Sequence, residues 1–226
     1  MYSMIWFIVL AVMAASALIQ AVLNSKFKKY SKIPNDAGMT GAEIARKMLA
    51  DNGIFDVTVT SVEGRLTDHY NPEDKTVNLS PDVFSGRSVA AAAVAAHECG
   101  HALQHAKGYA PLKMRSSLVP IVSFSSRWVS WLLLIGVLLV ERFPAVLWAG
   151  IILFAMTTLF SFVTLPVEIN ASSRAVKWLE SSQIARAENN EKAVDALKWA
   201  AYTYVIAALG SLATLLYYIS IASSRR

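Results

Sequence analysis

The sequence predicts a predominantly α-helical integral membrane protein, with about four transmembrane helices and a small α+β region outside them. Hydrophobic residues make up 55% of the chain and charged residues only 16%, whereas about 25% of residues are charged in soluble proteins. The apolar residues are also concentrated in runs of about 20, the length that crosses a hydrocarbon core about 30 Å thick. These runs are residues 4–23, 118–140, 144–165 and 200–221.

The first apolar run is expected to be a retained membrane helix, residues 1–23. A cleaved signal peptide carries its positive charges before the apolar run and small residues after it. Here the first three residues are uncharged, and Lys26 and Lys28 follow the run. The order of charge and apolar sequence therefore favours an anchor.

The net charge of +5 does not indicate a nucleic-acid partner, because the basic residues flank the apolar runs. If the spans alternate, residues 24–117 and 166–199 lie on one side of the membrane. That side carries Lys26, Lys28, Lys29, Lys32, Lys113, Arg115, Arg174 and Lys177, and the other carries Arg142, Arg225 and Arg226. The positive-inside rule thus predicts that the large polar region is cytoplasmic. We expect a multi-pass protein of the plasma membrane.

The polar region, residues 24–117, contains signals for helices and strands. Thr40 and Glu43 form a capping-box pattern that predicts a helix up to Gly53. Three strand-like runs follow, 57–62, 65–70 and 76–80, which we expect to pair as an antiparallel meander. An alanine-rich helix should then run from about 88 to 107. The remaining segments are a transmembrane hairpin (118–165), a helical polar segment (166–199) and a last span (200–222).

The motif that carries chemistry is His97-Glu98-Cys99-Gly100-His101 on the alanine-rich helix. Residues four apart share one helix face, so the two imidazoles can converge on one metal ion and Glu98 can move a proton beside it. By chance the pattern is expected about 0.003 times in a chain of this composition. The alternative is a helix with two surface histidines and a glutamate.

A catalytic zinc site needs a third protein ligand. His105 continues the spacing, but it lies eight residues after His97, about 12 Å along a helix axis, so it cannot share the metal. Glu168 is the best candidate, because two predicted spans separate it from His101 and return the chain to the same side. An interfacial charge is the alternative interpretation of Glu168.

The motif, the two spans after it and the sequence from Glu168 to Ala171 resemble the membrane-embedded gluzincin proteases of the HtpX and CAAX-prenyl-protein protease type. Residues 39–48, 68–72 and 77–81 extend the resemblance to the YugP-type neutral zinc metallopeptidases of bacterial membranes. The resemblance implies a zincin-like catalytic region that binds Zn²⁺ through His97, His101 and Glu168. It also implies an endopeptidase in which Glu98 is the base for a zinc-activated water, acting on membrane-associated polypeptides.

The sequence departs from the HtpX-type pattern at Ser172, where that family usually has an aspartate able to orient a ligand histidine. A ligand imidazole needs a partner for its other nitrogen. Ser172, Asn170 or a backbone carbonyl could supply it, and the sequence leaves these alternatives open.

Other residues near the motif have two readings each. His69 could stabilise an oxyanion or be a solvated turn residue. By analogy with such proteases, strand 76–80 could pair with extended substrate as an edge strand.

Cys99 could bind metal or be a small packing residue, and as the one cysteine it forms no internal disulfide. Gly100 suggests that another backbone packs closely there.

Two rival functions follow from the same residues. A site-2-type intramembrane protease would place the motif inside a span, but the motif helix is too polar, with Arg87, His105 and Lys107. A non-catalytic membrane scaffold or adaptor could hold a structural or degenerate metal site. Such a site has no need of a base, so the intact Glu98 argues against it. The oligomeric state is not predicted.

Overall fold

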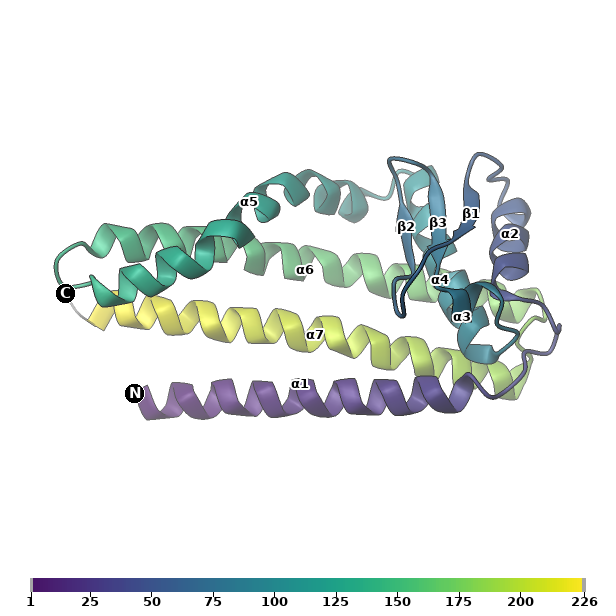
Figure 1. The fold of residues 1–226 in the computed structure, drawn as a ribbon, viewed down its shortest axis with the longest axis horizontal. Coiled ribbons are helices and arrows are strands. Elements are labelled where there is room, and N and C mark those ends of the chain that lie inside the picture. Colours follow the sequence, from purple (N-terminus) through teal and green to yellow (C-terminus); the bar gives the residue numbers. More distant parts are fainter. Residues whose placement is uncertain (1, 225–226) are drawn as a thin grey trace. The chain divides into compact units, whose positions relative to one another are not determined.

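The computed structural model describes residues 2–224 of the chain, with side chains from residue 7. Its elements, in order, are α1 (Tyr2–Tyr30), α2 (Gly41–Asp51), β1 (Thr58–Ser61), β2 (His69–Asn71), β3 (Thr76–Leu79), α3 (Pro81–Phe84), α4 (Val89–Ala106), α5 (Ala110–Leu138), α6 (Pro144–Ser181) and α7 (Ala187–Ser224) (Figure 1). The chain divides into a membrane unit, comprising residues up to Leu18, Lys113–Leu165 and residues from Thr203, and a site unit, comprising Ile19–Leu112 and Pro166–Tyr202.

Four helices of the described residues are long and apolar enough to cross a membrane: Phe7–Tyr30 of α1, α5, α6 and α7. Each leaves large apolar side chains uncovered by protein, as lipid-facing helices do. These include Phe7, Leu10, Trp131, Leu138, Ile152, Leu159, Leu209 and Leu216. The predicted fold class, a helical membrane protein with a small α+β region, is confirmed. Arg225 and Arg226, used above for orientation, lie outside the described residues.

Within the membrane unit, α5 and the first part of α6 form a close antiparallel hairpin. A Cβ added at Gly136 would lie 2.5 Å from Leu147 Cα, and one at Gly150 would lie 3.0 Å from the Leu133 backbone nitrogen. Small residues of this kind let membrane helices approach each other. α5 also bends along its length (Figure 1), and Pro120 lies inside it, where it removes a backbone donor.

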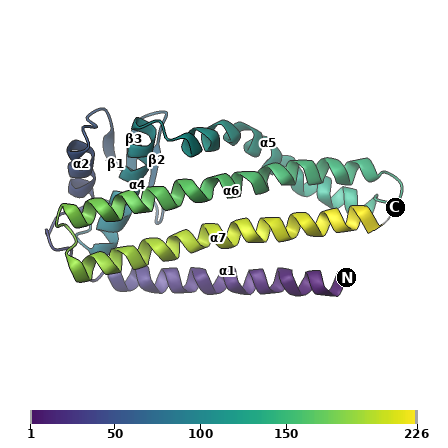
Figure 2. The ribbon, with the colours of Figure 1, turned by 180° about the vertical axis from the view of Figure 1, so that it is seen from behind.

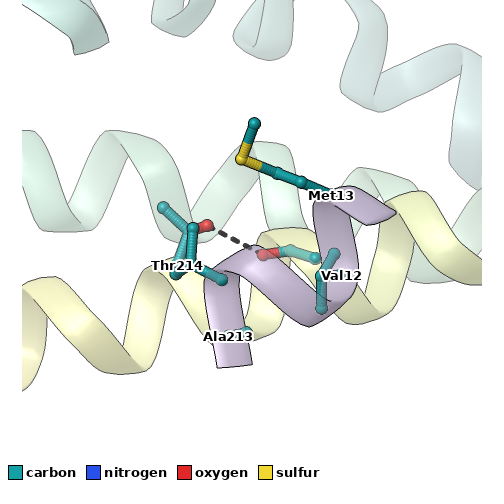
Figure 3. Close-up of a pocket in the computed structure, with 6 residues that line it drawn as sticks. Val12, Met13, Ala213 and Thr214 are labelled. Carbon is teal, nitrogen blue, oxygen red and sulfur yellow. Dashed lines mark hydrogen bonds between the residues drawn. The ribbon is translucent and has the colours of Figure 1, made fainter. Parts of the chain in front are cut away.

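Helices α1 and α7 run side by side in the membrane unit (Figure 2). A Cβ at Gly210 would come within 2.9 Å of Val12 Cγ1, so this glycine permits the contact. Thr214 Oγ1 donates to the Gly210 carbonyl over 2.9 Å, which satisfies the hydroxyl inside its own helix (Figure 3). The shallow hollow there is lined by Val9, Val12, Met13, Gly210, Ala213 and Thr214.

The sheet of the site unit has the strand order β1-β3-β2 (Figure 1), so the predicted antiparallel meander is wrong. β3 pairs with β2 antiparallel and with β1 parallel. The chain from β1 to β2 therefore passes across the end of β3. The Asp68 carboxylate fixes this crossing, since it accepts from the Ser80 backbone nitrogen over 2.8 Å. Alternating apolar residues define strands but not the order in which they pair.

The central place of β3 also corrects the expected substrate strand. Strand 76–80 cannot be an edge strand, because β3 is paired along both sides. The free edges of this sheet belong to β1 and β2. Any extended polypeptide that adds to the sheet has to pair with one of these two strands.

The core of the site unit joins α2, α4 and one face of the sheet. Ile44 and Met48 from α2, with Val77 and Leu79 from β3, are fully buried. They pack with the alanines of α4, whose small side chains allow neighbours to approach from several sides. The predicted capping box starts α2: the Thr40 backbone donates to Glu43 Oε2 over 2.7 Å, and the Glu43 backbone donates to Thr40 Oγ1 over 3.2 Å.

Candidate metal centre

The candidate site lies where α4 crosses the second part of α6, and Gly100 makes the crossing possible. A Cβ at Gly100 would lie 2.6 Å from the Ala171 carbonyl oxygen and 3.0 Å from Ala171 Cα. These are backbone atoms, so they cannot turn away as a flexible side chain could. The close backbone contact that the sequence suggested at Gly100 is therefore present.

The contact predicts the effect of Gly100→Ala. On an exposed helix this change stabilises by about 1 kcal/mol, but here the added methyl group overlaps backbone and is expected to destabilise by about 1–3 kcal/mol. Thermal unfolding in detergent should show a lower midpoint, and zinc binding should weaken because the two helices separate. Ala106→Ser, at an exposed position of α4, should change neither. A Gly100→Ala protein at least as stable as wild type would contradict the close packing.

Three side chains from the two helices meet in one cluster: His97, His101 and Glu168. Their potential ligand atoms all lie within 4.8 Å of one another. Glu168 Oε2 is 3.3 Å from His97 Nε2 and 3.6 Å from His101 Nε2. The imidazole rings meet nearly at right angles, with their centroids 4.8 Å apart. His101 and Glu168 are buried, and His97 is half-buried.

This arrangement fits a zinc ion. Tetrahedral zinc with bonds of about 2.0–2.1 Å holds neighbouring ligands about 3.3–3.4 Å apart, close to the two nitrogen–oxygen distances in the cluster. Two imidazoles and one carboxylate are also a common ligand set of catalytic zinc sites. Three protein ligands leave a fourth position for water or substrate, so the set suits a catalytic site better than a closed structural one.

The charges around His101 favour a cation. Burial by itself would lower the pKa of His101, but the hydrogen bond to Glu168 and the charges of Glu98 and Glu168 outweigh burial and hold this pKa above its ordinary value. Two carboxylates thus act on a buried imidazole. A bound metal cation would replace a proton as the positive charge that this environment stabilises.

Both histidines are held through their other ring nitrogen. Ser172 Oγ is 3.1 Å from His97 Nδ1, and Gln104 Oε1 is 3.1 Å from His101 Nδ1. Among the alternatives that the sequence left open, Ser172 is therefore the hydrogen-bond partner of His97. Asn170 bonds to Gln104 instead. Sequence reasoning missed Gln104 as the partner of His101, although a residue three positions along a helix lies on the same face.

Glu98 lies on α4 beside this cluster, next in sequence to His97, and is 8% exposed. It is not part of the three-residue group. Its charge nevertheless reaches the group, since it is one of the causes that raise the pKa of His101. The carboxylate is thus buried, close to the candidate ligands and separate from them.

Comparison with known proteins decides the family. Residues 4–223 match the family described as "Putative neutral zinc metallopeptidase". The chain belongs to this family. It is 45% identical over 216 residues to a protein of Bacillus subtilis (strain 168) named "Putative membrane protease YugP", with 95% of each chain covered. No solved structure shows significant similarity to the chain. Membership and the four candidate spans make the protein a multi-pass membrane member of a zinc metallopeptidase family.

The two remaining histidines lie apart from the cluster. His69 is exposed on β2, where Nδ1 lies 2.7 Å from the Thr67 carbonyl oxygen and Nε2 lies 3.3 Å from Asn78 Nδ2. None of these contacts reaches the candidate ligands, so its role at an oxyanion stays a prediction. His105 is exposed, and its Nδ1 lies 2.8 Å from the Tyr70 hydroxyl.

Cys99 is a packing residue on the opposite side of α4 from the candidate ligands. It is fully buried, and its Sγ contacts the Ala45 carbonyl oxygen of α2 at 3.5 Å. Burial raises the pKa of the thiol, so the thiolate that would bind metal is disfavoured. Of the two interpretations of Cys99, a metal-binding thiol or a small packing residue, the structure supports the packing residue.

Proposed function

We propose that the protein is a membrane-embedded zinc-dependent endopeptidase that hydrolyses peptide bonds in membrane-associated polypeptides. His97, His101 and Glu168 would hold the zinc ion, and Glu98 would be the catalytic base. The observation that carries this proposal is the convergence of two imidazole nitrogens and one buried carboxylate oxygen beside a separate buried glutamate. Family membership supports both zinc and peptidase chemistry.

The proposed reaction divides the work between the metal and the chain. Zinc in such a site lowers the pKa of water towards 7 and polarises the substrate carbonyl. Glu98 accepts a proton from the water as it attacks the carbonyl carbon. The same carboxyl group then donates that proton to the amine nitrogen as the peptide bond breaks. Ser172 and Gln104 keep the two imidazoles turned towards Glu168.

The position of Glu168 supports a membrane-associated substrate. Glu168 lies on α6, a continuous helix that is also a candidate span. A polypeptide that reaches this residue therefore approaches the helix that enters the bilayer. Pairing with the free edge of β1 or β2 would hold it extended for cleavage. The basic residues near the predicted span ends favour the cytoplasmic face of the plasma membrane.

The decisive experiment measures zinc and cleavage in the same preparation. Wild-type protein purified in detergent should contain about one zinc ion per chain and should cleave an unfolded polypeptide, with products identified by mass spectrometry. Removal of zinc with 1,10-phenanthroline should abolish cleavage, and added zinc should restore it. His105→Gln, which removes an exposed histidine outside the cluster, should behave as wild type.

The result also separates the proposal from its main rival. Stoichiometric zinc without chelator-sensitive cleavage of the polypeptide, or of a membrane-anchored version of it, would favour the scaffold with a structural metal site. Protein that binds no zinc would contradict the proposed peptidase and would agree only with a scaffold whose metal site is degenerate.

A further inference from the structure

Gln104 is the polar side chain that connects the two halves of the candidate centre. It follows His101 by three residues on α4 and is 0% exposed. A buried amide is costly unless its donors and its acceptor are paired. In Gln104 both ends of the amide have partners, and these partners belong to two different helices.

The partners fix which end of the amide is which. Gln104 Nε2 lies 2.7 Å from the Val167 carbonyl oxygen and 3.1 Å from Asn170 Oδ1. A backbone carbonyl only accepts hydrogen bonds, so the atom that faces Val167 has to be the NH₂ group. Arg174 gives independent support, because its Nε, which only donates, meets the same Asn170 oxygen at 2.7 Å.

The orientation of the amide determines the state of His101. With NH₂ turned to α6, the Gln104 oxygen faces His101 Nδ1 at 3.1 Å. This oxygen only accepts, so Nδ1 carries the proton. The other nitrogen, Nε2, then faces Glu168 Oε2 at 3.6 Å and has its lone pair available for a metal.

We propose that Gln104 is a positioning residue that selects the metal-binding tautomer of His101 and holds this imidazole against the Glu168 segment of α6. The inference rests on the proposed function, because it assigns His101 and Glu168 to one zinc ion. Val167 and Asn170 lie on either side of Glu168 in the sequence. One side chain thus ties a ligand of α4 to the turn of α6 that carries the other ligand.

Further contacts hold the α6 end of this connection in place. Arg174 Cζ lies 6.0 Å from the centre of the Tyr109 ring, and the Tyr109 hydroxyl donates to the Pro166 carbonyl over 3.5 Å. Asn170 Oδ1 is therefore held by Arg174 as well as by Gln104. This oxygen stays an acceptor, and the orientation of the Gln104 amide follows from it.

The test compares two substitutions that keep the size of the side chain. Gln104→Met removes both the acceptor for His101 and the donors to α6. Gln104→Glu keeps an oxygen that accepts from Nδ1 whether or not its carboxyl group is ionised, so the two variants differ in that acceptor. Zinc dissociation constants would be measured in detergent by competition with a chromophoric chelator. The visible spectrum of the cobalt-substituted protein would report the coordination geometry.

We expect Gln104→Met to bind zinc about 10–100-fold more weakly than wild type and to have an altered cobalt spectrum. Gln104→Glu should recover most of the affinity and the wild-type spectrum, and His105→Gln should match wild type throughout. Wild-type affinity in Gln104→Met would overturn the proposal. Equal losses in both variants would also overturn it, because the acceptor for His101 Nδ1 would then make no contribution to zinc binding.

If Gln104→Met does not fold, the proposal can be tested on the zinc-loaded wild-type protein. Nitrogen-15 NMR of the histidines should then show a slowly exchanging proton on His101 Nδ1, and rapid exchange would overturn the proposal. Failure of the Gln104 proposal can be distinguished from failure of the proposed function. If the proposed function is wrong, wild-type protein itself will bind no zinc or cleave no polypeptide, whatever the Gln104 variants do.

Discussion

Glu98→Gln is expected to lower peptide cleavage by about 10²–10⁴-fold, the usual contribution of a general base, and to leave the zinc content unchanged. The two effects separate because Glu98 is buried beside the cluster but is not one of its three members. Glutamine has nearly the same shape as glutamate, so α4 should pack as before. The glutamine side chain has no carboxylate, however, and cannot take a proton from the attacking water. Rates at saturating substrate, with zinc measured on the same sample, check this expectation.

A matched control tests whether the loss of cleavage comes from the position of Glu98 or from the removal of a negative charge in general. Glu180→Gln removes a carboxylate from an exposed position on α6 and should keep both activity and zinc. A Glu98→Gln enzyme with more than about a tenth of the wild-type rate, well above the range for a lost base, would show that another group moves the proton.

The parts of the site that the sequence predicted are those governed by a short stretch of helix. The spacing of His97 and His101 places both on one face of α4, and their ring centroids lie 4.8 Å apart. Gly100 in a helix otherwise rich in alanine indicated a close neighbour, and the Ala171 backbone is that neighbour. The histidine geometry repeats every turn, so a few residues are enough to define it. The missing side chain of Gly100 marks a close approach, although it does not say which backbone approaches.

The parts that the sequence did not predict depend on partners far along the chain. The order β1-β3-β2 depends on where the loop after β1 crosses, and the Asp68–Ser80 bond that fixes the crossing joins two separate segments. Gln104 looked like an ordinary helix residue until its amide was seen to reach Val167 and Asn170. A polar residue three positions after a candidate ligand, predicted to be buried, is the signal that could have identified it.

Glu168→Ala is the second substitution with a large expected effect, and it addresses metal binding directly. Removing one of three protein ligands should weaken zinc binding well beyond the 10–100-fold loss that is typical for an outer hydrogen-bonding partner. Cleavage should disappear with the metal, because the remaining pair of imidazoles cannot define a tetrahedral site. Zinc affinity measured by chelator competition, with cleavage assayed at the same free zinc concentration, checks both effects.

The size of this loss has meaning only beside two other variants on the same helix. Ser172→Ala removes the hydrogen bond to His97 Nδ1 but keeps all three ligands, so its loss of affinity should stay within the range for outer partners. Glu180→Ala removes an exposed carboxylate and should bind zinc as wild type does. The order Glu168→Ala, Ser172→Ala, Glu180→Ala, from the largest loss to none, follows from distance to the imidazole Nε2 atoms. If Glu168→Ala kept zinc as well as Ser172→Ala, Glu168 would be a neighbour of the metal and the third ligand would have to come from elsewhere.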